Sequence, residues 1–152
     1  MKDGLKESLK RLERLFQIRQ TYVSVAEAGV KNAEREVRKL EADETRVTGN
    51  IQDTRAGIAY LQTATGHDLH SGEKYISALE MQRKQIHQSL EKAEGNLEER
   101  RGEWTEAMRE QRIIEKLQER RLHQYEREDD VEAQKSQDDI TIARYVRTRL
   151  KD

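Results

Sequence analysis

The chain has 152 residues, of which 39% are charged and 34% are apolar, and this composition is too polar for a broad globular core. Its 29 basic and 30 acidic residues are interspersed, so no large field of one sign is available to attract nucleic acid or an anionic membrane. The chain contains neither cysteine nor proline, which excludes disulfides and thiolate metal sites and removes the strongest helix breaker, so long helices are expected.

The first predicted helix follows an apolar repeat that begins at Leu5. Apolar residues recur in alternating steps of three and four over about eight heptads, and only Arg19, Glu44 and Thr54 interrupt the series. A 3.5-residue period is the requirement for a left-handed coiled coil, because it keeps one seam facing a partner helix. The repeat predicts a helix over about residues 3–62, in which Arg19 and Glu44 specify the alignment.

A glycine-containing segment, TATGHDLHSGEK, interrupts the repeat. Gly66 and Gly72 both lie within a stretch of seven residues. Asp68 or Ser71 is suited to cap a new helix, because its side chain can accept a hydrogen bond from the first backbone amides of that helix. The segment therefore predicts a loop over about residues 63–71.

A second apolar repeat follows the loop and predicts a helix over about residues 72–148. It keeps the three-four alternation as far as Ile114. Beyond that residue a slip of register is expected, because one 3.5-residue frame cannot hold all of Leu117, Leu122 and Tyr125.

Two helices joined by a short loop are expected to fold back on each other. The predicted fold class is therefore all-α: a long two-helix antiparallel coiled-coil hairpin, formed as one domain by residues 1–152. The second helix is the longer one, so everything after about residue 136 is expected to be a C-terminal helical overhang.

Residue pairing across the predicted hairpin follows from the position of the loop. A turn centred near residues 67–70 places Trp104 opposite Ala33, a large side chain against a small one, as dense packing favours. The same estimate places Leu5 opposite Glu132.

A second apolar stripe runs beside the main repeat near the chain termini. One interpretation is a seam that merely wobbles there, or a local contact with a third helix in a crystal or a dimer; the other is a docking surface for another protein, whose apolar anchors would be costly to leave in water. The pattern does not choose between them. The stripe comprises Leu15, Ile18, Tyr22 and Val25 in the first helix and Ile113, Leu117 and Leu122 in the second.

Two tyrosines, Tyr60 and Tyr75, flank the predicted loop. We interpret them as caps on the end of the seam, because tyrosine suits half-buried helix ends. The alternative is a tip that contacts a second partner.

The sequence predicts no catalytic, cofactor-binding or metal-binding residues. His67 and His70 lie near Asp68 and Glu73, but zinc sites have a tighter ligand set, so a solvated turn is favoured. Phosphate-binding loops, serine elbows and dinucleotide fingerprints are absent from the sequence. A two-helix rod encloses no pocket in which a carboxylate would be desolvated, so an enzyme is not expected.

The compartment is expected to be the cytoplasm. The start, MKDGLKESLK, is charged throughout and lacks the apolar core of a signal peptide. No apolar run approaches the roughly 20 residues that a membrane span needs.

Two segments resemble the flagellar export protein family FliJ. They are LKRLERLFQIRQ at the start and EERRGEWTEAMREQRIIEKLQERRLHQYEREDDVEAQKSQDDITIARY in the second half, and the resemblance covers most of the chain. It implies a non-catalytic stalk, similar to the stalk subunit of rotary ATPases, that inserts its two chain ends into the hexameric export ATPase ring. The hairpin would contact the cytoplasmic domain of the export gate, and export chaperones are further implied partners.

The resemblance also suggests which residues meet each partner. The ring-facing positions are Leu5, Leu9 and Leu12 at the start and Arg144, Tyr145 and Arg147 at the end, and the apolar stripe extends this candidate ATPase end. The candidate gate end comprises Leu40, Val47, Tyr60, Leu61, Tyr75 and Leu79. Two features depart from the family: the late acidic pair is Asp138-Asp139 where Asp-Glu is usual, and the loop is longer.

Two other functions fit the same pattern. The stalk of a virulence-type injectisome shares the architecture and partners, and a homodimeric scaffold would pair its helices in parallel between two chains. The stalk interpretation implies a protein that is a monomer in isolation and that associates peripherally with the inner-membrane export apparatus, with no nucleic acid as partner.

Overall fold

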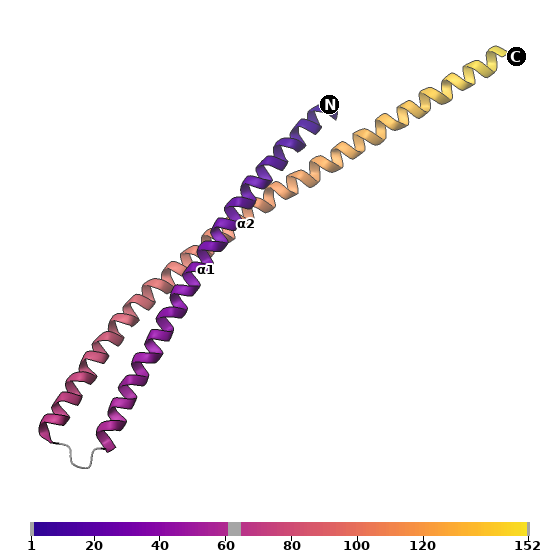
Figure 1. Ribbon diagram of the computed structural model, residues 1–152. Helices are drawn as coiled ribbons and strands as arrows, with labels where there is room; N and C mark the ends of the chain where they lie inside the picture. The colour runs from indigo at the N-terminus through magenta and orange to yellow at the C-terminus, as the bar shows by residue number, and fades with distance from the viewer. Residues whose placement is uncertain (1, 61–64, 152) are drawn as a thin grey trace. The chain divides into compact units, whose positions relative to one another are not determined.

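The computed structural model of the protein describes residues 2–60 and 65–151. They form two helices, α1 (Lys2–Tyr60) and α2 (Gly66–Lys151), and these residues include no strand (Figure 1). The helices of one chain pack against each other in opposite directions, which confirms the predicted all-α antiparallel hairpin. The parallel pairing of the alternative scaffold is not the observed arrangement.

Stretches of α1 and α2 form two compact units. The loop-end unit comprises Ser24–Thr105, and the terminal unit comprises Met1–Val23 with Glu106–Asp152. Each unit contains an antiparallel stretch of both helices, so each has its own seam and its own surface.

The seam of the loop-end unit is built from the residues that the heptad repeat predicts. We call the two seam positions of each heptad a and d. Two clusters of buried residues occupy these positions, and partly buried apolar residues such as Ile76, Ile86 and Leu90 pack against them. The buried members are Val30, Ala33, Val37 and Leu97 in one cluster and Val47, Ile51 and Leu79 in the other.

Trp104 packs against the cluster of Val30, Ala33, Val37 and Leu97, and its predicted position directly opposite Ala33 stays a prediction. The members of this cluster are small or aliphatic, which leaves a narrow seam room for the largest side chain. The indole Nε1 of Trp104 is buried and finds no hydrogen-bond acceptor among the described residues. An unsatisfied buried donor costs about 1–3 kcal/mol, so the apolar contacts of the ring must exceed that cost.

The seam of the terminal unit keeps the same heptad frame. Leu5 and Val23 of α1 are buried, and the seam positions between them are half-buried. On α2 the half-buried positions continue through Gln118, Tyr125 and Glu128. The predicted slip of register after Ile114 is therefore wrong. The helix pair keeps its frame, and polar residues replace the apolar ones at several seam positions.

Arg100 is an exception to the predicted repeat of α2, because its side chain is exposed. Its guanidinium pairs with Glu103 at 3.2 Å, while its stem passes the backbone of Gly29. A long charged side chain buries its methylene groups and keeps its head in water, so this seam position is covered without burial of a charge.

Both charged residues of the α1 repeat have partners on α2. In the terminal unit Arg19 pairs with Glu110 at 2.5 Å, and in the loop-end unit Glu44 Oε1 lies 2.7 Å from His87 Nε2. Half-exposed pairs of this kind contribute little to stability, but they favour one alignment of the helices over its neighbours.

The predicted loop is too long. Helix α2 begins at Gly66, not near residue 72, so His67, Asp68 and Ser71 are helical. Thr65 and Asp68 explain this start: the Thr65 amide donates to Asp68 Oδ2 at 3.3 Å and the Asp68 amide donates to Thr65 Oγ1 at 3.2 Å. This reciprocal capping box stabilises the first turn of α2. It thereby offsets the conformational entropy that Gly66 loses in the helix. The predicted end of the first helix near residue 62 lies outside the described residues.

The early start of α2 shifts the pairing at the open end by about one turn. Lys2, not Leu5, lies level with Glu132: its ammonium pairs with Glu132 at 3.2 Å and also with Asp129. All side chains from Val131 to Lys151 are exposed, and α2 continues past the start of α1 (Figure 1). We call residues 136–151 the overhang. It extends beyond the predicted helix end at about residue 148.

Gly72 and Gly95 make a matched pair for testing the packing near the loop. A Cβ at Gly72 would lie 2.5 Å from Ile58 Cδ1, whereas a Cβ at Gly95 would meet nothing within 4 Å. We expect Gly95→Ala to raise the free energy of unfolding by about 0.5–1 kcal/mol, because alanine favours the helix. Gly72→Ala must displace the Ile58 side chain and should yield no gain. Urea unfolding monitored by circular dichroism measures both, and an equal gain in the two variants would contradict the close packing at Gly72.

Candidate partner-binding surfaces

The ATPase-end candidates at the chain start belong mostly to the seam. Leu5 is buried, and Leu9 and Leu12 are half-buried against α2. The side chains of these three leucines pack within the terminal unit. They therefore offer a partner less exposed apolar surface than the sequence predicts. They position α1, and the surface of this unit is formed by other residues.

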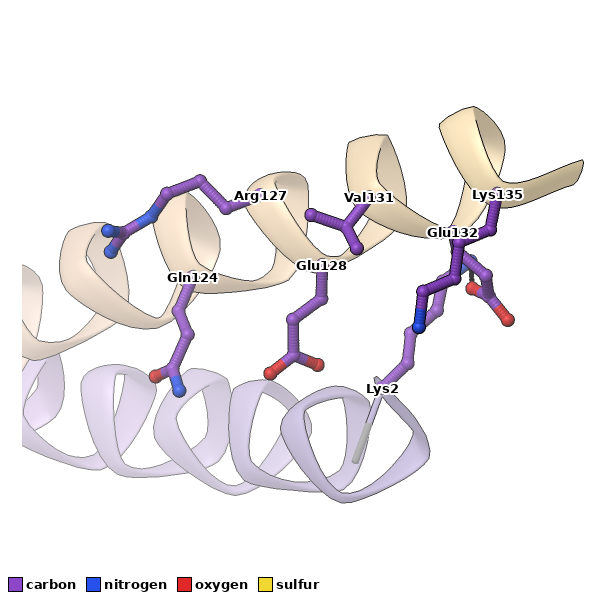
Figure 2. A pocket seen from close by; sticks show the side chains of 7 residues that line it. All are labelled: Lys2, Gln124, Arg127, Glu128, Val131, Glu132 and Lys135. Carbon is purple, nitrogen blue, oxygen red and sulfur yellow. Dashed lines mark ion pairs between the residues drawn. The ribbon is translucent and has the colours of Figure 1, made fainter. Parts of the chain in front are cut away.

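Lys2 ties the start of α1 to α2. Its ammonium pairs with Asp129 and Glu132 and lies 5.6 Å from the centre of the Tyr125 ring, a cation–π distance. Hydrogen bonds with Asp129 and then Glu132 raise the pKa of Lys2 above its ordinary value. Figure 2 shows the shallow groove at this end, where Gln124 and Glu128 extend from α2 toward α1. Charged side chains dominate the groove, so it is not an apolar pocket.

The stripe beside the seam is exposed, as a docking surface requires. The exposed fractions of Leu15, Ile18 and Tyr22 are 44%, 50% and 57%, and Ile113 and Leu117 on α2 are 54% and 37% exposed. Val25, 67% exposed, belongs to the loop-end unit. Within the terminal unit no third helix and no widening of the seam covers these side chains, among the residues that the structure describes.

Leu122 does not share a face with the other α2 members of the predicted stripe. It lies five positions after Leu117, and five residues rotate a helix by about 140° from the starting direction. Ile113 and Leu117, four positions apart, do share a face. Leu122, 49% exposed, therefore belongs to the opposite flank of α2. The predicted stripe included Leu122 because it was assembled from nearby apolar residues without regard to their angular positions around the helix axis.

Ion pairs show which flanks of the two helices lie together. In the loop-end unit, Glu34 pairs with Arg101 at 3.9 Å and Arg55 with Glu80 at 2.8 Å. All four residues occupy position e, directly after a d residue. In each helix, the e and g positions lie on opposite sides of the a and d seam. When the two helices run antiparallel, the e positions of both meet along one flank of the pair and the g positions meet along the other flank.

The apolar stripe occupies the g flank of the terminal unit. Leu15, Tyr22 and Leu117 are at position g, and Ile18 and Ile113 are at position c beside it. The hydrogen bond from Gln118 to Glu13, 3.2 Å, and that from Gln111 to Gln20 place Ile18 level with Ile113 and Leu15 level with Leu117 to within one residue. These five side chains form one continuous surface, which we call the terminal stripe.

The overhang carries the other exposed group of the ATPase end. Tyr145 is 60% exposed, and Arg144 and Arg147 are exposed on either side of it. The Arg149 guanidinium lies 5.5 Å from the centre of the Tyr145 ring. Ile142 and Val146 share this side of the helix and are also exposed, which the helical spacing of the tail predicts.

The gate-end candidates divide between the seam and the surface. Val47 and Leu79 are buried and Leu40 is half-buried, so all three hold the loop-end unit together. Tyr60 and Tyr75 are 87% and 52% exposed, which fits a contact surface better than a cap on the seam. Leu61 lies outside the described residues. Two exposed apolar residues that sequence reasoning missed, Leu69 and Met81, belong to the same unit.

No group of three or more His, Cys, Asp or Glu side chains in the described residues is arranged to hold a metal ion. Across residues 2–60 and 65–151, neither helix has a stretch long and apolar enough to cross a membrane.

Comparison with known proteins identifies one family. The family model described as "Flagellar FliJ protein" matches residues 8–150, nearly the whole chain. No curated protein and no solved structure matches the chain.

Ile18 and Val23 distinguish the exposed stripe from the seam of the same unit. We expect Ile18→Glu to change the free energy of unfolding by less than about 0.5 kcal/mol, because the side chain is half in water. Val23→Glu places a charge in the seam and should lower that free energy by about 2–4 kcal/mol. Equal destabilisation by both substitutions, measured by urea unfolding, would mean that the stripe is part of the core.

Proposed function

The chain belongs to the family of flagellar FliJ proteins, and from that membership we propose that this flagellar export protein is a non-catalytic stalk. The overhang would enter the hexameric export ATPase ring, and the loop-end unit would contact the cytoplasmic domain of the export gate. Work done by ATP hydrolysis in the ring would thus be linked to opening or loading of the gate.

The observation that carries this proposal is the exposed overhang. Residues 136–151 form a single helix that α1 does not accompany, and every one of their side chains is exposed. A single helix is about 10–12 Å across with its side chains, so it fits a channel that would exclude a helix pair. Tyr145 with Arg144 and Arg147 supplies the aromatic and basic groups that are typical of anchors in protein interfaces.

The overhang also has a physical reason to stay helical before it binds. An isolated helix of about 12–15 residues is marginal in water because nucleation is costly. The overhang needs no nucleation, since it continues a helix that the terminal unit already holds. It therefore loses less conformational entropy on binding than a disordered tail would.

The terminal unit and the loop-end unit would serve different partners. In the loop-end unit, buried Val47 and Leu79 fix the helix pair, while exposed Tyr60 and Tyr75 are available to the gate. We place the protein in the cytoplasm, peripherally attached to the inner membrane through the export apparatus, with export chaperones as further partners.

The ATPase contact is tested by mixing the purified chain with its cognate export ATPase. We expect the full chain to promote ring assembly and to raise ATP turnover several-fold, and a chain truncated after Lys135 to lose most of this effect. Gly95→Ala, a full-length variant that leaves the overhang and the terminal stripe unchanged, should behave as the parent. Sedimentation velocity and a phosphate-release assay measure the two effects. Absence of any effect from the full chain would refute the coupling role.

The gate contact has a separate test. We expect the double variant Tyr60→Ala and Tyr75→Ala to weaken binding to the isolated gate domain by about tenfold or more, because exposed tyrosines are frequent interface anchors. The same variant should still stimulate the ATPase. Binding is measured by calorimetry, and unchanged affinity would exclude these tyrosines from the gate contact.

A further inference from the structure

The overhang presents an apolar face that has no partner within the chain. The heptad frame of α2 continues through it, with Asp139, Ile142, Val146 and Arg149 at the a and d positions. Ile142 and Val146 are 61% and 48% exposed, and Tyr145 borders them. A helix that keeps the seam pattern beyond the end of its partner is suited to pack on another helical surface.

Charge is ordered along this face of the overhang. On this face Asp138 and Asp139 precede the apolar residues, and Arg149 follows them. The overhang is therefore acidic at its start and basic at its end, with the apolar group between.

The terminal stripe has the opposite order. Arg11 and Arg120 lie at its end nearest the chain termini, one helical repeat from Ile18 and Ile113 respectively. Neither has an ion-pair partner in the part of the chain that the structure describes. Glu106 and Glu110 lie at the other end, where Glu106 pairs with Arg109 at 3.3 Å and Glu110 with Arg19 at 2.5 Å. The stripe is therefore basic, then apolar, then acidic.

We propose that the overhang of a second copy of this chain docks on the terminal stripe. Asp138 and Asp139 would meet Arg11 and Arg120, and Arg149 would join Arg19 beside Glu110. The apolar residues Ile142 and Val146 would lie between the α1 and α2 members of the stripe.

The two surfaces agree in length as well as in charge. From Asp138 to Arg149 the overhang advances about 16 Å, at about 1.5 Å per residue. Both helices of the stripe have the same rise, and Arg11 and Glu110 mark the two ends of a stretch of similar length. Ile142 falls at the level of Leu15 and Leu117, and Val146 at the level of Ile18 and Ile113.

Direction permits a reciprocal exchange. The overhang points away from its own open end, and on the stripe of a second copy it would run from that copy's open end inward, parallel to α1. Two copies that face each other through their open ends can each donate an overhang to the other. This is a closed two-fold arrangement, in which further copies cannot add.

Each overhang–stripe contact is small, because a stripe offers five apolar side chains where standard interfaces involve about 20–30 residues a side, and the reciprocal dimer contains two such contacts. Standard interfaces have dissociation constants of about micromolar or tighter, so we expect a constant of about micromolar or weaker here, and a monomer, as the stalk interpretation implies, at much lower concentration. The dependence on ion pairs at both ends predicts weaker association at high salt.

The test measures the mass of the full chain by sedimentation equilibrium from about 1 to 300 µM, without ATPase, a range that covers micromolar and weaker dissociation constants. The expected result is a shift from one chain of 17.9 kDa to twice that mass. Ile142→Glu in the overhang and Ile18→Glu in the stripe should each weaken association at least tenfold. Ile140→Glu, at an exposed position on another side of the overhang, is the matched control and should leave association unchanged.

Charge exchange tests the arrangement itself. Arg120→Glu should weaken association, and adding Asp139→Arg to the same chain should restore it, since each new charge meets its opposite in the second copy. Circular dichroism confirms that every variant is folded.

Three outcomes would overturn the proposal. One is a monomer at all concentrations, which would reserve the stripe for a different protein. Another is a dimer that Ile18→Glu breaks and Ile142→Glu does not, which would mean that two stripes pack on each other. The third is failure of the charge exchange to restore association. If the overhang also enters the ATPase ring, as proposed above, the ring and the second copy compete for the overhang. The sedimentation measurement contains no ATPase, so its result does not depend on that proposal.

Discussion

In each of the two units, burial among the described residues is confined to the seam between the two helices, and the remaining features depend on that constraint. In the loop-end unit the seam contains two clusters of aliphatic residues, from Val30 to Leu97 and from Val47 to Leu79. Two helices have only one common interface, so each heptad buries about two residues per helix and leaves the others in water. Exposed side chains are therefore the rule, and only those that are both large and apolar indicate a partner.

This constraint separates residues that hold the structure from residues that are available for contact. Leu5, Val47 and Leu79 are apolar and belong to the candidate sites, yet the seam uses them. Tyr60 and Tyr145 are of similar size and lie largely in water. A protein of this architecture can bind several partners in succession along its surface without a pocket, because its fold needs none of those surface residues.

The heptad repeat predicted the seam well because a 3.5-residue period has only one structural solution, and positions from Leu5 to Ile58 are buried or half-buried as expected. The loop was predicted poorly because two glycines were given more weight than the capping box of Thr65 and Asp68. That error displaced the pairing at Lys2 by about one turn. The composition of the terminal stripe was visible in the sequence, but the separation of Leu122 from Leu117 requires the angle between them and the flank on which the helices meet.

We propose that the overhang is the end of the protein that engages the export ATPase. A photoreactive amino acid placed at Tyr145, and in a second chain at Tyr60, tests it when each chain is irradiated with the assembled ATPase ring. The account predicts a covalent product with the ATPase from position 145 and none from position 60. A product from position 60 alone would contradict it, because the ring would then hold the loop end of the hairpin.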